Sequence, residues 1–241
     1  HGRKEAGLID IAVIRTPRIS NFTDFIVLEN IKGVSLRYVR DCREFKHPDM
    51  IILPGTKNTM EDLLWMRQNG LETEVKKAAA KGTIVWGICG GYQMLGMSIA
   101  DPDNVEEGGA IRGMELLPVE TILQKSKKRC QTEGLVDKVE GIFRGISGCE
   151  FQGYEIHMGE TRYADCSVKD DAIVPFPSDD LKQRPDNKVV VQSEKYENVY
   201  GSYVHGIFDQ AEIANAILRA LAQKKGITIG EGELLDYQAF K

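Results

Sequence analysis

Short apolar runs alternate with helix-like segments through the first half of the chain. The runs cover residues 9–14, 34–39, 50–53 and 83–88, and polar or turn-forming residues flank each of them. Apolar runs of this length are typical of strands that are buried on both faces of a parallel sheet. The alternation therefore predicts an α/β fold, with a mostly parallel central sheet and helices on both faces.

Capping residues indicate where the intervening helices begin and end. Asn21 or Thr23 is placed to cap a helix over residues 21–31. Thr59 and Asp62 match a capping box for a helix that Gly70 would end. Because a further helix is predicted over residues 71–81, just before the next apolar run, this half has the order expected of a doubly wound sheet.

The second half of the chain has strand-like segments without long helices between them. These segments cover residues 113–123, 134–140 and 151–161. We interpret them as an antiparallel extension of the same domain. Residues 175–187 are polar and proline-rich, which predicts a loop.

The chain closes with two more strands and a helix. The strands are predicted over residues 188–192 and 199–204, and the helix over residues 210–224 has an apolar face. Residues 1–8 are polar and indicate a tail or linker, so the predicted domain covers residues 9–241. The sequence lacks an initiator Met, and we expect it to be a piece of a longer protein.

Charge and hydropathy exclude two classes of partner. The 241 residues carry a net charge of −5, which argues against a nucleic-acid surface. The one dense basic run, at residues 125–129, is interpreted as a solvated loop. No apolar run approaches the ~20 residues that a membrane-spanning helix needs, so no membrane partner is expected.

The cysteines favour a reducing compartment. There are five of them, an odd number, and no CxxC pair occurs. A structural disulfide framework or a zinc site is therefore not expected, and neither is any other metal site. A cytoplasmic protein fits this pattern best. The five are Cys42, Cys89, Cys130, Cys149 and Cys166.

Cys89 is the candidate nucleophile. It directly follows a predicted strand, glycines surround it at positions 87, 90 and 91, and a helix is predicted next. A strand–turn–helix of this kind exposes a nucleophile on a tight turn, and the helix N-terminus favours the thiolate. The alternative is a small buried core cysteine, which does not require flanking glycines.

A cysteine nucleophile needs a base within hydrogen-bonding reach. His205 follows the strand predicted over residues 199–204, at a position equivalent to that of Cys89 after its own strand. His157 is the reserve candidate. A lone histidine at a strand end is more often structural than catalytic, and the pairing with Cys89 is what favours His205.

Five motifs carry a family resemblance. Residues 87–93 (GICGGYQ) resemble the G-x-C-x-G-x-Q signature of class I, triad-type glutamine amidotransferases. Three more motifs, together with YVHGIF at 203–208, resemble the C-terminal glutaminase domain of the cobyric acid synthase family. They are PRISNFTD at 17–24, LPGTKNT at 53–59 and GYEIHMG at 153–159.

The resemblance implies a flavodoxin-like fold and a role for each matched residue. Cys89 would attack the γ-amide of glutamine and form a glutamyl thioester, with His205 as the proton shuttle. Gly90 and the loop at Gly55 would donate N–H groups to the oxyanion, and Gln93 would help to seat glutamine.

In that family the ammonia passes to an N-terminal synthetase domain. That domain uses ATP and Mg²⁺ to amidate adenosylcobyrinic acid a,c-diamide, a corrinoid, in cobalamin biosynthesis. No G-x-x-x-x-G-K-[ST] phosphate loop occurs in these residues, so we expect the synthetase domain to be absent and this domain to need no cofactor.

One departure leaves the third member of the triad open. Many triad amidotransferases have His-Pro-Glu, whereas this chain has Gly206 and Ile207 after the histidine. Glu155 and Asp209 are the candidates to orient the imidazole, and Glu155 serves equally well as an acceptor or interface contact. For residues 17–24, capping by Asn21 and Asp24 is the simplest explanation, with a role at the synthetase interface or corrinoid site as the alternative.

Four other functions compete with this assignment. Two are sister amidotransferases, namely the glutaminase component of cobyrinic acid a,c-diamide synthase and that of the enzyme that amidates lipid II. The third is a cysteine hydrolase of the peptidase kind. The fourth is a non-catalytic binding module on the same scaffold, against which the intact Cys89, Gln93 and His205 count.

Overall fold

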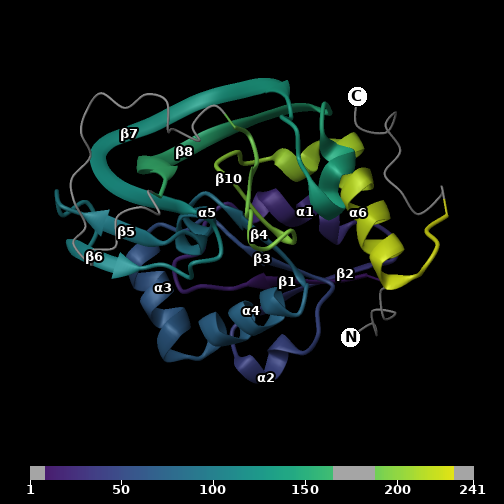
Figure 1. Cartoon of the computed structure of the whole chain (residues 1–241), viewed down its shortest axis with the longest axis horizontal. Coiled ribbons are helices and arrows are strands. Elements are labelled where there is room, and N and C mark those ends of the chain that lie inside the picture. Colours follow the sequence, from purple (N-terminus) through teal and green to yellow (C-terminus); the bar gives the residue numbers. More distant parts are fainter. Residues whose placement is uncertain (1–8, 165–187, 231–241) are drawn as a thin grey trace.

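A computed structural model describes residues 9–164 and 188–230 of the chain. Its central sheet has six strands in the order β2-β1-β3-β4-β10-β9 (Figure 1). Only β9 pairs antiparallel to its neighbour within this sheet. The order of the five parallel strands is flavodoxin-like, as predicted. The bounds are β1 Ile9–Ile14, β2 Val34–Val39, β3 Met50–Leu53, β4 Ile84–Ile88, β9 Val191–Gln192 and β10 Val199–Ser202.

Alternate side chains of the central strands point into two separate cores. In β1, Ile11 and Val13 pack into one core, while Ala12 and Ile14 pack into the other. All four are completely buried. Because successive side chains of a strand point to opposite faces, a fully apolar strand requires cover on both sides.

Helices provide that cover on both faces. The first core contains side chains from the short helices η1 and α1, from η2 and from the closing helix α6, and the second contains side chains from α2 to α5. The bounds on the first face are η1 Phe22–Phe25, α1 Ile26–Glu29, η2 Gly141–Ile146 and α6 Ala211–Lys225. Those on the second face are α2 Cys42–Phe45, α3 Thr59–Gln68, α4 Leu71–Ala80 and α5 Gly90–Leu95.

A second sheet lies beside the central one and corresponds to the predicted antiparallel extension. Its order is β6-β5-β7-β8, and its longest strands form the curved ribbon seen above the central sheet in Figure 1. The β5–β6 and β7–β8 pairs are antiparallel as expected, but β5 and β7 are parallel. The bounds are β5 Ser98–Asp101, β6 Gly109–Arg112, β7 Val119–Leu135 and β8 Glu150–Tyr163.

Two predictions in this region are wrong. The strand expected over residues 134–140 ends at Leu135, where β7 stops. The basic run at 125–129 is exposed as predicted, but it lies within β7 rather than in a loop, and Lys127 to Arg129 pair with β8. The predicted tail at 1–8 and the predicted loop at 175–187 lie outside the described residues.

The two predicted caps are also wrong. Helix α3 is capped by Asn58, whose side chain accepts a hydrogen bond from the N–H of Glu61, and not by Thr59. Residues 21–31 form a 3-10 turn and a single α-helical turn, and Asn21 makes no side-chain capping bond. The Thr59 hydroxyl contacts Gln93 instead, and the Asn21 amide contacts the ring of His205.

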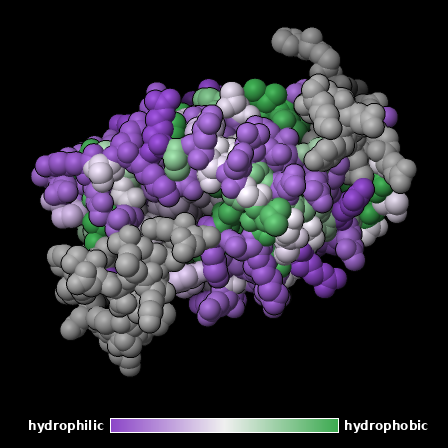
Figure 2. Space-filling model, turned by 90° about the horizontal axis from the view of Figure 1, so that it is seen from above, coloured by the Kyte–Doolittle hydropathy of each residue, from purple (hydrophilic) through white to green (hydrophobic). Residues whose placement is uncertain are grey.

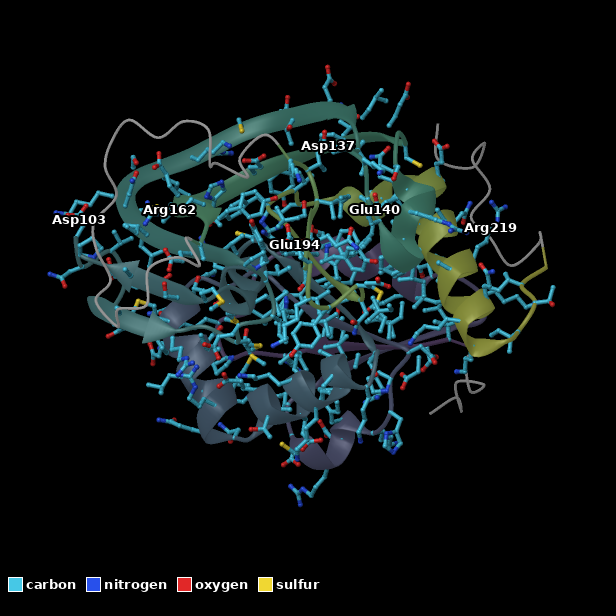
Figure 3. All side chains as sticks on the ribbon, in the orientation of Figure 1. Asp103, Asp137, Glu140, Arg162, Glu194 and Arg219 are labelled. Carbon is cyan, nitrogen blue, oxygen red and sulfur yellow. The ribbon has the colours of Figure 1, made fainter. Side chains whose placement is uncertain are left out.

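Among the described residues, none of the helices combines the length and apolar character needed to cross a bilayer. The face seen in Figure 2 is mostly hydrophilic, with a limited hydrophobic area near its centre. Figure 3 shows side chains filling the space between the β7–β8 ribbon and the central sheet, while the labelled Asp103, Asp137 and Arg219 lie at the periphery.

Candidate active site

Cys89 occupies a strained turn between strand β4 and helix α5. Its backbone has φ 52° and ψ −111°, outside the regions that non-glycine residues favour. Its N–H donates to the carbonyl of Ser202 (2.8 Å), which ties the turn to β10. The turn is tight enough that a Cβ atom at Gly91 would lie 2.1 Å from the carbonyl oxygen of Leu53. This is the strand–turn–helix arrangement predicted for the nucleophile.

The fold brings His205 beside Cys89. Strands β4 and β10 are parallel neighbours, with Ile88 opposite Ser202, so both residues follow the same edge of the sheet. Gly55 lies between them. A Cβ atom on Gly55 would be 3.1 Å from His205 Cε1 and 3.7 Å from Cys89 Cβ. The structure therefore places the predicted Cys89 and His205 near each other, with the predicted Gly55 loop alongside.

Asp24 is the carboxylate that holds His205. Its Oδ2 lies 2.8 Å from His205 Nδ1, and its Oδ1 accepts the N–H of Gly206 (3.1 Å). His205 is fully buried, and Asp24 is 2% exposed. Burial lowers the pKa of His205, but hydrogen bonds and charge from Asp24 and Cys89 outweigh it and raise this pKa to about 10.

Neither carboxylate that the sequence offered holds His205. Glu155 instead pairs with Lys128 (2.6 Å) and with His157 Nε2 (3.4 Å). The hydrogen bond from His157, followed by that from Lys128, lowers the pKa of Glu155 to about 2 against the opposing effect of burial. In the described part of the chain, Asp24 is the carboxylate that is hydrogen-bonded to His205.

Asp209 lies close to the site without bonding to the imidazole. Its Oδ2 is 3.2 Å from where a Cβ atom on Gly206 would be. Burial, and then the negative charge of Asp24, raise the pKa of Asp209 to about 6. This carboxyl group is thus a neighbour of Asp24 rather than a partner of His205.

His157, the reserve base, is bound to other groups. Its ring stacks on Tyr203, with centroids 3.7 Å apart and an interplanar angle of 14°. Its Nδ1 lies 3.2 Å from the carbonyl oxygen of Gly159, and its Nε2 faces Glu155. The structure therefore favours His205 over His157 as the partner of Cys89.

Gln93 is buried and fully engaged with the protein. Its Oε1 accepts from Thr59 Oγ1 (3.1 Å), while its Nε2 donates to the carbonyl of Met158 (3.2 Å) and contacts the Tyr203 hydroxyl (3.1 Å). Only 2% of the residue is exposed. Gln93 thus ties helices α3 and α5 to strand β8, where the resemblance had implied a contact with glutamine.

Strand β8 crosses the edge of the sheet where Cys89 and His205 lie. The Cys89 thiol donates to the carbonyl of Ile156 (3.3 Å). Tyr154 exchanges two backbone hydrogen bonds with His205 (3.2 and 2.8 Å) and stacks on its ring. The backbone of β8 thereby forms one wall of the site.

Asp24 is the carboxylate beside His205 that the sequence did not reveal. Residues 17–24 stood out as a motif, and their simplest explanation was helix capping. The signal that could have identified Asp24 is the missing glutamate after His205, because a buried imidazole base requires an acceptor at Nδ1. No group of His, Cys, Asp and Glu side chains in the described ranges is arranged to hold a metal ion.

Known proteins resemble this chain over most of its length. The sequence model of the CobB/CobQ-like glutamine amidotransferase domain matches residues 10–213. A cobyric acid synthase of Lachnoclostridium phytofermentans is 47% identical over 99% of this chain and 47% of that protein. One of Ruminiclostridium cellulolyticum is 48% identical over 98% of this chain and 45% of that protein. The chain thus spans about half the length of these curated relatives.

Solved structures agree on the fold. PurLQS of Thermotoga maritima superposes with a TM-score of 0.61 at 19% identity, covering 90% of this chain and 99% of that chain. A solved glutamine amidotransferase superposes with a TM-score of 0.54 at 15% identity, with the same coverage. With the family match over most of its length and a cysteine–histidine pair at the expected sheet edge, the chain belongs to the CobB/CobQ-like glutamine amidotransferase domain family.

Proposed function

We propose that this chain is the glutaminase part of a cobyric acid synthase, in which Cys89 and His205 hydrolyse glutamine to release ammonia. The observation that carries the proposal is the buried Asp24–His205 pair beside a cysteine held in a left-handed turn. A nucleophile, its base and an orienting carboxylate in this order are the parts that acyl-transfer chemistry requires.

The proposed reaction proceeds in two steps. The Cys89 thiolate attacks the γ-carbonyl carbon of glutamine, and the imidazolium of His205 protonates the departing amide nitrogen, which leaves as ammonia. The glutamyl thioester then reacts with water, and His205 takes up one proton of that water. The products are glutamate, ammonia and the free thiol, so the atoms balance.

Backbone groups are proposed to stabilise the oxyanion. Gly90 is the first residue of helix α5, directly after Cys89, so its N–H is one proposed donor. The Gly55 loop, which adjoins both catalytic side chains, is proposed to supply the other. Gln93 is proposed to shape the glutamine site through its bonds to Met158 and Tyr203. Glu155 and His157 are proposed to support the same wall from β8 rather than to take part in proton transfer.

The ammonia is proposed to serve a synthetase domain outside this chain. That domain would use ATP and Mg²⁺ to amidate the corrinoid adenosylcobyrinic acid a,c-diamide in cobalamin biosynthesis, and no cofactor is proposed for the domain described here. The names of relatives that are twice as long support this assignment. A cytoplasmic location is proposed because Cys89 acts as a free thiol.

The test combines glutamine turnover with covalent labelling. We expect Cys89→Ala to abolish ammonia release while the midpoint of thermal unfolding stays close to that of the wild type. We also expect 6-diazo-5-oxo-norleucine, a glutamine analogue, to label the wild type at Cys89. Cys42→Ala is the matched control, because Cys42 donates to the carbonyl of Asn69 away from the site.

The outcomes separate the competing functions. Turnover that persists in Cys89→Ala would refute the nucleophile. Absence of both turnover and labelling in the wild type, and also in the protein joined to its synthetase part, would favour the binding module. Thiol reactivity without labelling by the analogue would favour a cysteine hydrolase of another kind.

A further inference from the structure

Asn21 has a positive φ angle directly before the 3-10 helix η1. Its φ of 55° and ψ of 51° are in the left-handed region, which asparagine enters more readily than other non-glycine residues. Although it precedes η1, its side chain makes no capping hydrogen bond. Its carbonyl accepts the N–H of Asp24 (3.0 Å), so the conformation of Asn21 sets the position of the carboxylate that holds His205.

The side chain of Asn21 lies over the imidazole of His205. Its Nδ2 is 3.1 Å from Nδ1 and also 3.1 Å from Nε2. A position in the ring plane at equal distance from both nitrogens would bring Nδ2 within about 2 Å of Cε1, which van der Waals repulsion forbids. The amide therefore contacts the face of the ring and leaves the in-plane nitrogens to other partners.

Asp24 and Cys89, two neighbours of the His205 ring, determine the orientation that the ring needs. Nδ1 is directed at Asp24 (2.8 Å), and Cys89, which adjoins Gly55 as the ring does, raises the pKa of the imidazole. A rotation of the ring about its χ angles would break both relations. An amide resting on the ring face blocks such a rotation.

The segment that carries Asn21 is fixed to the neighbouring loop. The N–H of Ser20 donates to the carbonyl of Gly55 (2.8 Å), and Ile19 forms an isolated bridge with Thr56. The amide of Asn21 is thus held relative to the loop that adjoins Cys89 and His205.

We propose that Asn21 is a positioning residue, which holds the His205 ring so that Nδ1 stays on Asp24 and Nε2 faces the Cys89 thiol. This inference rests on the proposed glutaminase function and assigns to the 17–24 motif a role in it beyond that of Asp24. The titratable groups around the ring are Asp24, Cys89, Asp209 and Tyr154.

Asn21→Gly tests the proposal with little strain, because glycine accepts the left-handed backbone and removes only the amide. Asn21→Asp keeps the shape of the side chain and places a carboxylate on the ring. Asn104→Gly is the matched control, since Asn104 is also left-handed (φ 51°) and is exposed in a loop outside the site.

Three measurements distinguish positioning from a structural role. They are the thermal unfolding midpoint, kcat and KM for glutamine, and the pH midpoint of Cys89 alkylation by iodoacetamide, located by peptide mass spectrometry. For Asn21→Gly we expect kcat to fall about tenfold or more. We expect the alkylation midpoint to lie at higher pH than in the wild type, because the thiolate would lose the imidazolium beside it, and we expect unfolding as in Asn104→Gly.

In Asn21→Asp we expect the His205 ring to keep its position, and we expect the added carboxylate to stabilise the imidazolium form of the ring. The alkylation midpoint of this variant should stay closer to the wild-type value than that of Asn21→Gly, and the alkaline limb of kcat/KM should move to higher pH. If Asn21→Gly does not fold, this variant carries the test.

Wild-type kcat and alkylation midpoint in a folded Asn21→Gly would overturn the proposal, as would an Asn21→Asp profile that matches the wild type. Failure of the glutaminase function has a different signature, namely no turnover and no labelling by the glutamine analogue in the wild type. The iodoacetamide comparison requires no glutamine, so it tests Asn21 in that case too.

Discussion

At the scale of single residues, the site depends on which tautomer His205 adopts. Asp24 accepts from Nδ1 through Oδ2 and from the N–H of Gly206 through Oδ1, which leaves Nε2 as the nitrogen available for the proposed proton exchange with Cys89. In Asp24→Asn, the amide oxygen can still accept from Gly206, but the amide nitrogen then faces Nδ1. Because that nitrogen is a donor, it selects the tautomer that carries its proton on Nε2.

We therefore expect Asp24→Asn to lower kcat for glutamine by a factor of about a hundred or more, with little loss of stability. The charge of Asp24 raises the pKa of His205, so its removal should also shift the alkaline limb of the pH profile to lower pH. Asp209→Asn is the control, because Asp209 lies nearby without a hydrogen bond to the ring. A larger loss in Asp209→Asn than in Asp24→Asn would contradict this assignment.

Only part of the site could be predicted from the sequence. Cys89 and His205 were predictable because each follows an apolar strand, and parallel strands of one sheet bring such positions to one edge. Asp24 is 181 positions away from His205 and lies on a short helix with no periodic pattern. Its contact depends on the tertiary path of residues 17–24, which local propensity does not encode.

At the scale of secondary-structure elements, strand β8 must approach the end of β10 closely. Gly153 permits this approach, since a Cβ atom there would lie 2.2 Å from the carbonyl oxygen of His205 and 2.7 Å from Val204 Cγ1. The obstructing oxygen belongs to the backbone that places the catalytic imidazole. A side chain at Gly153 therefore has to displace either β8 or His205.

We expect Gly153→Ala to reduce the free energy of unfolding by about 1–3 kcal/mol and to lower glutamine turnover as well. Gly145→Ala is the matched control, because the nearest atom to its new methyl group would be Ala216 Cβ at 3.9 Å. Urea denaturation and an ammonia assay measure the two effects. Wild-type values in Gly153→Ala would show that β8 does not press on His205.

Elements with buried apolar strands were predicted well, and those with exposed polar strands were not. Strands β1, β2 and β3 have the predicted bounds. In contrast, β7 continues through the exposed basic run, where pairing with β8 and not hydrophobic burial keeps the chain extended. Strands β5 and β6 were not predicted. They are four residues each, too short for a period to be recognised.

At the scale of the whole molecule, one sheet serves two cores. Strands β1, β3 and β4 contribute alternate side chains to each, so the loss of one core would expose the opposite side of the same strands to water. The two cores should therefore unfold together even though they do not contact each other through the sheet. This coupling also links the helices that carry Asp24 and Gln93 to one cooperative unit.

The chain's two tryptophans test this coupling, because they report on different cores. Trp86 is fully buried in the first core against Tyr200, with ring centroids 5.6 Å apart, and Trp65 packs against the second. Trp65→Phe and Trp86→Phe each leave one reporter. Trp86→Phe is expected to be the less stable variant, because it leaves a space in the core.

Each fluorescence curve in urea is therefore compared with the circular dichroism of the same variant. We expect the two midpoints to coincide in both variants, since a shared sheet permits only one transition. A fluorescence midpoint that clearly precedes the loss of secondary structure in either variant would mean that one face of the sheet unfolds by itself. The geometry around Cys89, which draws on both faces, could then be lost while the rest of the protein remains folded.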